Sequence, residues 1–283
     1  MSGVRSFRFA QVDVFTATPF AGNPVAVVFG AMDVDSATMQ RIAQWTNLSE
    51  TVFVGPPTVA GADYHARIFA QDEELPFAGH PTLGVAHAVL DAGIATPTDG
   101  FLRMQCGAGV VDVAVRGGDD YAFRLPRHAS SAVTNAELLP SALGIAAIIG
   151  TPEMVDVGPH WLIARVDDVA QLAPDAGVLR TVVQSNRATG LTLYSERADG
   201  GIGVRTFFFV GQLAEDPICG SGNAAVAVHR MRAGKIRTGD RYLAQQGQQI
   251  GRDGQVDVRL DEAGVHVGGH CITCIRGEIV IPG

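Results

Sequence analysis

The sequence contains few of the features that mark secreted or membrane proteins. Its 283 residues include only four cysteines, too few for a disulfide framework, which favours a reducing compartment. No stretch approaches the roughly 20 apolar residues that a membrane-spanning helix needs. The first residues, MSGVRSFRFAQVDVF, alternate like a strand and lack the apolar centre of a signal peptide. We therefore expect a cytoplasmic protein without membrane contacts.

Positive charge is also scarce. The 21 lysines and arginines are outnumbered by 29 aspartates and glutamates, which gives a net charge of −8, and they form no basic run. This balance argues against binding to phosphate backbones, so we expect no nucleic-acid partner. Apolar residues make up 47% of the chain and charged residues 18%, which is typical of a folded protein long enough for two domains.

The sequence does not indicate a metal site. Cys271 and Cys274 form a CxxC pair, but the surrounding segment is typical of a β-strand, in which an offset of three puts side chains on opposite faces. Neither a second CxxC nor an HxxxH completes a zinc-binding set. We expect both cysteines to be structural.

One motif occurs twice in the chain. ELPFAGHPTLGVAHAVLDAG (residues 74–93) and EDPICGSGNAAVAVHRMRAG (residues 215–234) share Glu, one residue, Pro, two residues and Gly, followed by an apolar segment that reaches a second Gly. Upstream, both copies also have Arg, one residue and Phe. Two copies in opposite halves predict two related domains. The polar stretch near residues 127–140 predicts the boundary, which gives domains 1–127 and 128–283.

Each copy is expected to be a loop that begins a buried helix. His80 and Ser221 are candidate caps, and Pro81 suits the first helical position. Gly93 and Gly234 suit the left-handed position that ends a helix. Free N–H groups and the positive end of the dipole make a helix N-terminus an anion site, so two such ends across a cleft would grip a small carboxylate.

Strand-like alternation dominates the rest of the chain. Helical patterns are fewer, at residues 36–47, at residues 136–149 and in the two repeats. Many short strands with one or two buried helices in each half predict an α+β fold, with a mainly antiparallel sheet wrapped around a helix in each domain.

The differences between the two copies indicate asymmetric chemistry. Aligned by position, the differing pairs are Leu75 with Asp216, Ala78 with Cys219, and His80 with Ser221. These groups suit proton transfer at a carbon next to a carboxylate, which needs a base, an acid and stabilisation of negative charge. The helix N-terminus is expected to lower the pKa of the Cys219 thiol and make it a working acid or base. Glu50, between a predicted helix and an apolar strand, is a second candidate.

At these residues the chain resembles the PhzF family, phenazine-biosynthesis-like isomerases that share the fold of diaminopimelate epimerase. Four motifs occur in order: VDVFTATPFAGNPVAVV, LSETVFV, ELPFAGHPTLG and EDPICGSGNAA. The resemblance implies two similar halves, each an antiparallel sheet around a central helix, with the active site in the cleft between them. It implies that a C-terminal strand, about residues 272–283, joins the first domain. It also implies a homodimer that uses no cofactor.

The resemblance further implies roles for individual residues. Glu50 would move a proton between carbons, Asp216 would hold and polarise the substrate, and His80 would bind substrate or assist the transfer. The substrate's carboxylate and other groups would be bound by Asn23, Gly79, Gly220 and Ser221.

One difference from the PhzF pattern leaves more than one type of reaction possible. The second loop, DPICGSGNAA, is closer to the cysteine loop of diaminopimelate epimerase than to the DPxTGSA pattern of the PhzF family, but the position of the second cysteine of that epimerase falls at Ala78. A two-thiol racemase is therefore excluded.

Three hypotheses follow. The first is a cofactor-independent isomerase that uses Glu50 to move a proton on a small carboxylate-bearing metabolite, either amino-acid-like or of the cyclohexadiene type, such as dihydro-hydroxyanthranilate. The second is a one-thiol epimerase or lyase that pairs Cys219 with Glu50. The third is a protein that binds a metabolite without catalysis.

Overall fold

The computed structural model describes residues 3–282, which form two compact units. The first unit runs to Phe123 and includes the segment from Gly268 onward; the second is Arg124–Val267. Among the described residues, none of the helices combines the length and apolar character needed to cross a bilayer. Each unit is described separately below.

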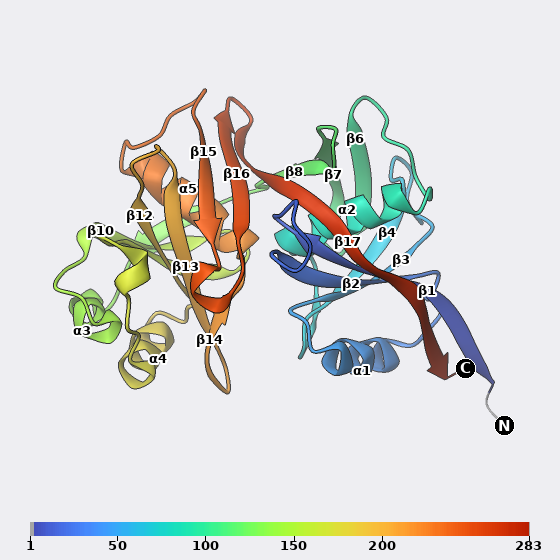
Figure 1. Cartoon of the computed structure of the whole chain (residues 1–283), viewed down its shortest axis with the longest axis horizontal. Helices are drawn as coiled ribbons and strands as arrows, with labels where there is room; N and C mark the ends of the chain where they lie inside the picture. The colour runs from blue at the N-terminus through green and yellow to red at the C-terminus, as the bar shows by residue number, and fades with distance from the viewer. Residues whose placement is uncertain (1–2, 283) are drawn as a thin grey trace. The chain divides into compact units, whose positions relative to one another are not determined.

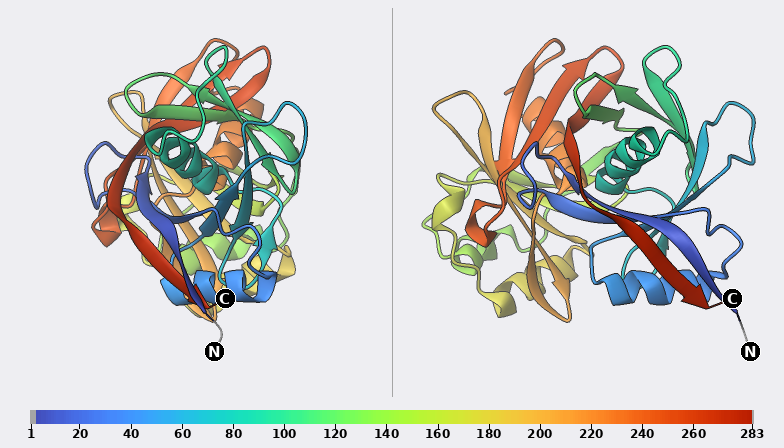
Figure 2. Two further views of the ribbon diagram at one scale, coloured as in Figure 1. Left: turned by 90° about the vertical axis from the view of Figure 1, so that its right-hand side faces the viewer. Right: turned by 45° about the vertical axis from the view of Figure 1, so that its right-hand side comes forward.

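The first unit wraps strands around helix α2 (Gly79–Asp91), as the right-hand view of Figure 2 shows. Strand β1 pairs antiparallel with both β2 and β17, β2 runs parallel to β3, and the other neighbours are mostly antiparallel. The elements of this unit besides α2 are β1 (Val4–Val14), β2 (Asn23–Phe29), α1 (Ser36–Thr46), β3 (Thr51–Gly55), β4 (Tyr64–Phe69), β5 (Glu74–Leu75), β6 (Phe101–Cys106), β7 (Gly109–Val115), β8 (Asp120–Arg124) and most of β17 (Gly264–Pro282).

Helix α2 is buried because its sequence is apolar on nearly every face. All residues from Gly79 to Val89 are buried. A methyl group added at Gly84 would lie 2.4 Å from Val25 Cγ1, so this glycine lets β2 approach the helix closely. The expectation of a helix surrounded by protein is confirmed.

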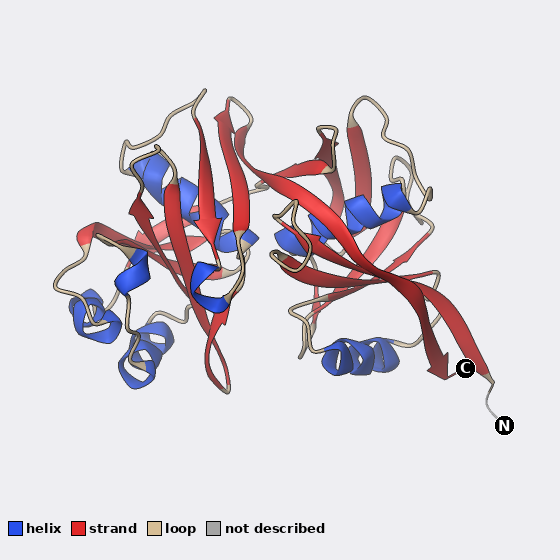
Figure 3. Cartoon of the chain, in the orientation of Figure 1, coloured by secondary structure: helices blue, strands red, loops and turns tan. Residues whose placement is uncertain are grey.

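The second unit is built in the same way around helix α5 (Gly220–Arg232), and Figure 3 shows its two outer helices beside the sheet. Leucines of the outer helices, such as Leu143 and Leu179, pack with Leu162 and Leu191 of the strands. The elements besides α5 are β9 (Ala129–Ala132), η1 (Ala136–Leu138), α3 (Leu139–Leu143), β10 (Ile149–Asp156), β11 (His160–Arg165), η2 (Val169–Gln171), α4 (Ala176–Ser185), β12 (Gly190–Glu196), β13 (Ile202–Val210), β14 (Gln212–Asp216), β15 (Arg241–Gln246), η3 (Gln248–Ile250), β16 (Gly254–Asp261) and the start of β17.

The two units share one order of strand pairing. In the first, β2 and β3 are parallel, β4 pairs antiparallel with β3 and β5 and parallel with β6, and β6 pairs antiparallel with β7. In the second, β11 to β16 repeat each step, with α4 in the place of α1 and α5 in the place of α2. The motif that occurs twice therefore marks a duplicated α+β unit (Figure 1).

Two expectations about helices are wrong. The predicted helix at residues 136–149 is a 3₁₀ turn followed by the short α3, because Gly144 takes the left-handed conformation (φ 68°) and ends it. Helix α4, whose N-terminus is capped by Asp175, was not predicted. The helix predicted at residues 36–47 is confirmed as α1, with Asn47 left-handed at its end.

The starts of the repeat helices also differ from the expectation. The capping positions are Ala78 and Cys219, not His80 and Ser221, because the chain is extended at these two residues and already helical at the glycine that follows each. Pro81 consequently lies at the third helical position. The stops were predicted correctly, since Gly93 and Gly234 both have φ 68°.

Candidate active site

Glu50 and His80 meet in the first unit. Glu50 directly precedes β3, and His80 lies in the first turn of α2. The Nδ1 atom of His80 is 2.9 Å from the Oε2 atom of Glu50, and the side chains are only 6% and 17% exposed. Two of the residues that the sequence assigned to the site are thus in contact.

This pair has unused hydrogen-bonding capacity. Within residues 3–282, Glu50 Oε2 and His80 Nε2 are buried atoms without a hydrogen-bond partner, so the short contact between the side chains lacks the alignment of a hydrogen bond. Unpaired buried polar atoms are costly, and here two of them occur on side chains that are in contact with each other. Contacts between catalytic groups are often poorly aligned until substrate is bound.

The N-terminus of α2 lies beside this pair. Among the described residues, no side chain caps this end of the helix. Gly79 packs against the Phe123 ring so closely that a methyl group on it would lie 2.5 Å from Cζ. The backbone N–H groups of Gly79 and His80 therefore remain available to an anion at the positive end of the dipole.

Asn23 begins β2 and is buried, at 1% exposure. Its backbone pairs with Val14 of β1. The preceding amide, that of Gly22, donates to the buried carboxylate of Asp13. The contact of Asn23 with substrate remains a prediction.

The second unit holds Asp216, Cys219 and Ser221 around the N-terminus of α5. Asp216 Oδ1 accepts a hydrogen bond from the Ile218 N–H, which tightens the loop. Trp161 Nε1 donates to Ser221 Oγ at 3.0 Å, and this oxygen lies 3.6 Å from Cys219 Sγ, so the Ser221 hydroxyl is held between the two side chains. Trp161 was missed by the sequence analysis, because 60 residues separate the partners.

The expected pKa shift of Cys219 is wrong in direction. The residue is 4% exposed, and burial raises the pKa of its thiol well above the ordinary value, with Asp216 adding to the effect. The hydrogen bonds to Sγ from Ser221 and from the Gly222 N–H lower the thiol pKa but are outweighed. The thiol serves instead as the cap of α5. This argues against a thiolate base at Cys219.

The shared Glu of the two motifs has a structural role that the sequence analysis did not assign. Glu74 accepts two hydrogen bonds from Arg67, at 2.8 and 2.6 Å, and Glu215 accepts two from Arg205, at 2.9 and 2.7 Å. Each guanidinium also lies over a Phe ring two residues along its strand, at 5.1 and 4.8 Å. The repeated Arg-x-Phe and Glu therefore anchor both loops to their strands.

Comparison with known proteins identifies similar chains. A family model described as phenazine biosynthesis-like protein matches residues 12–277. Antisense-enhancing sequence 1 of Schizosaccharomyces pombe is 37% identical over 96% of this chain and 98% of its own length. The trans-2,3-dihydro-3-hydroxyanthranilate isomerase of Pseudomonas chlororaphis is 32% identical over 97% of this chain and 99% of its own length.

Solved structures show the same fold. A predicted epimerase from Pseudomonas aeruginosa aligns with a TM-score of 0.81 and 28% sequence identity, over 96% of this chain and 99% of that one. The expected α+β, epimerase-like fold is confirmed.

Proposed function

The chain belongs to the phenazine biosynthesis-like (PhzF) family, and from this we propose that it is a cofactor-independent isomerase in which Glu50 carries a proton between two carbon atoms of its substrate. That the protein is an isomerase agrees with the names of several relatives. The contact between Glu50 and His80, with a buried unpaired atom on each side chain, is the observation that supports the assignment of Glu50.

The proposed reaction has two proton transfers. The Glu50 carboxylate takes a proton from one carbon and becomes a carboxylic acid, and the electron pair of the broken C–H bond is left on the substrate. The same carboxylic acid then protonates a second carbon, which restores the carboxylate and completes the shift of the double bond. No electrons are gained or lost overall, so the step needs no redox partner.

His80 has two roles in this proposal. Its Nδ1 lies 2.9 Å from the Glu50 carboxylate and would orient it when substrate is bound, and its Nε2, buried and unpaired within the described residues, is available to a polar group of the substrate. The uncapped N–H groups at the start of α2 would bind the substrate's carboxylate. Asn23 is proposed as a further substrate contact.

We also assign substrate binding to the second unit. The Ser221 hydroxyl and the backbone N–H of Gly220 lie at the N-terminus of α5, where an anion is favoured. Asp216 is proposed to hold a polar hydrogen-bond donor of the substrate, such as an amine. Cys219 has no chemical step in this proposal, because its buried thiol has a raised pKa.

The substrate to test first is trans-2,3-dihydro-3-hydroxyanthranilate, because similar proteins of Pseudomonas are named for its isomerisation. The enzyme is incubated with this compound in D₂O, and carbon-bound deuterium and product are followed by NMR. Wild type is expected to form product that carries deuterium. Glu50→Gln should lower kcat by about 10²-fold or more, because the amide cannot take up the proton.

Glu73→Gln is the matched control, since Glu73 is an exposed residue of the same unit. It should retain full activity. Equal rates for Glu50→Gln and wild type would overturn the role of Glu50, whereas a wild type that binds the compound without turnover would overturn this substrate.

A further inference from the structure

A cavity of about 290 Å³ lies in the second unit, at the C-terminal end of α5. The residues that line it include Thr151, Arg165, Tyr194, His229, Arg232 and Lys235. Cys219 and Ser221 lie at the opposite end of this 13-residue helix, about 20 Å away at 1.5 Å per residue. The cavity is therefore separate from the N-terminus of α5, to which substrate binding is assigned.

A β-bulge in β10 forms one wall of the cavity. Ile149 pairs with Arg165, and the next paired residues are Glu153 and Ile163, so residues 150–152 bulge out opposite a single residue of β11. Gly150 makes this possible with φ 76°. Bulges of this kind are common beside binding sites, because they redirect the backbone and side chains.

The buried side chains of His229 and Tyr194 form the floor of the cavity. His229 Nε2 lies 2.9 Å from the Thr151 carbonyl oxygen, which can only accept, so this nitrogen carries the proton. In the neutral ring, Nδ1 then accepts from the Tyr194 hydroxyl at 3.1 Å. Both side chains are buried. The floor is thus fixed by hydrogen bonds to both ring nitrogens.

The groups around the cavity carry an excess of positive charge. Glu153 pairs with Arg232 at 3.0 Å, and Glu196 lies 4.0 Å from Arg165 and 3.1 Å from Arg230. Lys235 adds a further cation, for which no carboxylate partner is found within residues 3–282. Among the residues that line the cavity, three cations, Arg165, Arg232 and Lys235, thus accompany one carboxylate, Glu153, in a chain whose net charge is −8. The Nε atom of Arg165 is also buried without a hydrogen-bond partner in the described part of the chain.

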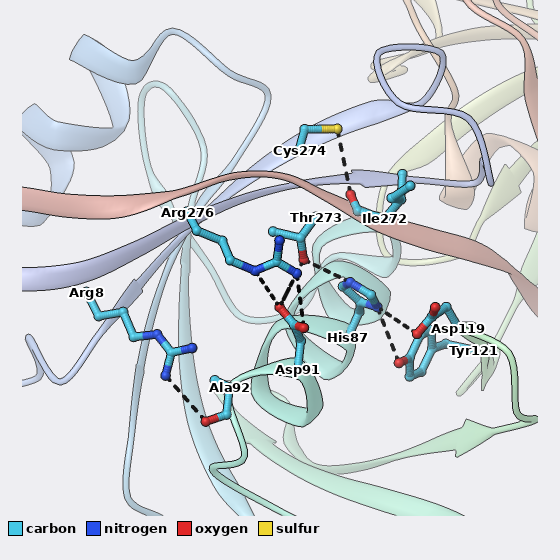
Figure 4. Close-up of polar contacts among 10 residues, drawn as sticks. All are labelled: Arg8, His87, Asp91, Ala92, Asp119, Tyr121, Ile272, Thr273, Cys274 and Arg276. Atoms are coloured by element: carbon cyan, nitrogen blue, oxygen red, sulfur yellow. Dashed lines mark hydrogen bonds and ion pairs between the residues drawn. The ribbon is translucent and has the colours of Figure 1, made fainter.

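The C-terminal end of α2 in the first unit can be compared with this end of α5. In Figure 4 the last residue of α2, Asp91, accepts hydrogen bonds from Arg276 and from Thr273, and Thr273 contacts the buried His87. The two motifs align without gaps, and the residue of α5 at the position of Asp91 is Arg232. In the first unit the helix provides the carboxylate of the ion pair, whereas in the second it provides the guanidinium, which pairs with Glu153.

We propose that this cavity binds a small anionic metabolite through its phosphate or carboxylate groups, with Arg165, Arg232 and Lys235 as the binding cations. The carboxylate of Glu153 already pairs with Arg232, so the ligand would add its negative charge beside Lys235 and Arg165. A volume of about 290 Å³ accommodates a phosphorylated or dicarboxylic compound of a few carbon atoms. The site is independent of the proposed proton transfer at Glu50.

The test is a titration of the full-length protein with inorganic phosphate, glycerol 3-phosphate and succinate at constant ionic strength. Binding is followed by isothermal calorimetry and by the amide NMR signals of Gly150, Thr151 and Lys235. Saturable binding of at least one of the three, with shifts at these amides, is expected. Stronger binding of the phosphates than of succinate would identify phosphate as the recognised group, and the reverse order would identify carboxylate.

Two variants and a control locate the site. Lys235→Glu should weaken the binding at least tenfold, while Arg237→Glu, an exposed neighbour that does not line the cavity, should change it less than twofold. Arg232→Asp copies the residue of the first unit and should abolish binding. Glu50→Gln should bind as wild type does, which separates this site from the active site.

Two results would overturn the proposal. One is the absence of saturable binding of all three anions to the wild type. The other is equal weakening by Lys235→Glu and Arg237→Glu, since that would indicate general attraction to a surface rather than a site. Melting temperatures within a few degrees of wild type would show that the variants are folded.

Discussion

The imidazole of His80 lies against the carboxylate of Glu50, with 2.9 Å between Nδ1 and Oε2. The two residues are 30 positions apart and come from the start of α2 and the residue before β3. Helix α2 is buried among the strands around it, so His80 has a defined place from which to orient the carboxylate. Because a proton carrier must stay aligned with both carbons, this contact should matter for kcat.

His80→Ala should therefore lower kcat by up to about 10²-fold, the loss expected when a catalytic group is misplaced by about an ångström. Its effect on KM separates two roles. If Nε2 also binds substrate, KM rises; if His80 only positions Glu50, KM is unchanged and His80→Asn restores part of kcat. Activity of both variants equal to that of wild type would contradict the importance of the contact.

The two equivalent Arg–Glu ion pairs allow the same interaction to be compared at two degrees of burial. The side chains of Arg205 and Glu215 are 9% and 10% exposed, whereas those of Arg67 and Glu74 are 21% and 39% exposed. Removing one partner of a buried pair leaves an uncompensated charge, so Glu215→Gln should lower the free energy of unfolding by about 3 kcal/mol. Glu74→Gln should cost about 1 kcal/mol or less, because water screens this pair.

Urea unfolding followed by circular dichroism measures both changes. The double variant Arg205→Met/Glu215→Leu is the control, because removing both charges together leaves no unpaired charge and should recover part of the loss, although the carbonyl oxygens of Val169 and Leu172 lose the donor Arg205. Equal effects of Glu215→Gln and Glu74→Gln would show that burial does not set the strength of these pairs.

The sequence predicts features that follow from local periodicity and spacing. The apolar faces of α2 and α5 and the glycines that end them are visible in the printed residues, and so is the duplication. The helix predicted at 136–149 fails because Gly144 interrupts a pattern that is otherwise helical. The contact of Trp161 with Ser221 could not be predicted, since it joins a strand to a helix 60 residues later.

Cys219 shows why the chemistry of a residue needs the structure. The sequence correctly predicts that Cys219 lies at a helix N-terminus, and the helix dipole there lowers the pKa of an exposed thiol. The extent of burial is not visible in the sequence, and here burial raises the thiol pKa by more than the hydrogen bonds from Ser221 and Gly222 lower it. The position of Cys219 alone therefore predicts the wrong direction for the shift of its thiol pKa.

Cys219 is accordingly expected to act as a cap and not as a nucleophile. Its Sγ accepts the Gly222 N–H at 3.2 Å, a role that a serine hydroxyl performs at least as well. Cys219→Ser should keep the activity within a few fold and the stability of wild type. Cys219→Ala should lose about 1 kcal/mol, the usual cost of removing a cap. Thermal unfolding and the isomerase assay measure both.

A thiol reagent gives an independent check of Cys219. In the folded protein at pH 8, DTNB should modify it more slowly than the partly exposed Cys274, with the modified residue identified by peptide mass spectrometry. Loss of activity in Cys219→Ser, together with rapid labelling of wild type, would restore the one-thiol mechanism.

Because His87 is buried, we expect the protein to become less stable in mild acid. Burial lowers the pKa of this residue below its ordinary value of about 6.5, in spite of the nearby carboxylates of Asp119 and Asp91. Between the two pKa values the unfolded chain binds a proton at His87 that the folded chain does not. The free energy of unfolding should therefore fall as the pH drops from about 6.5 toward the folded pKa, and level off below it.

Urea unfolding of wild type and His87→Gln at a series of pH values measures this contribution. The variant should be less stable than wild type at pH 8, because its contacts with Tyr121 and Thr273 are altered, but it should lose less stability on acidification. His160→Gln, a change at an exposed histidine, should show the same pH dependence as wild type. If His87→Gln and wild type lose stability in parallel, another group is responsible for the acid sensitivity.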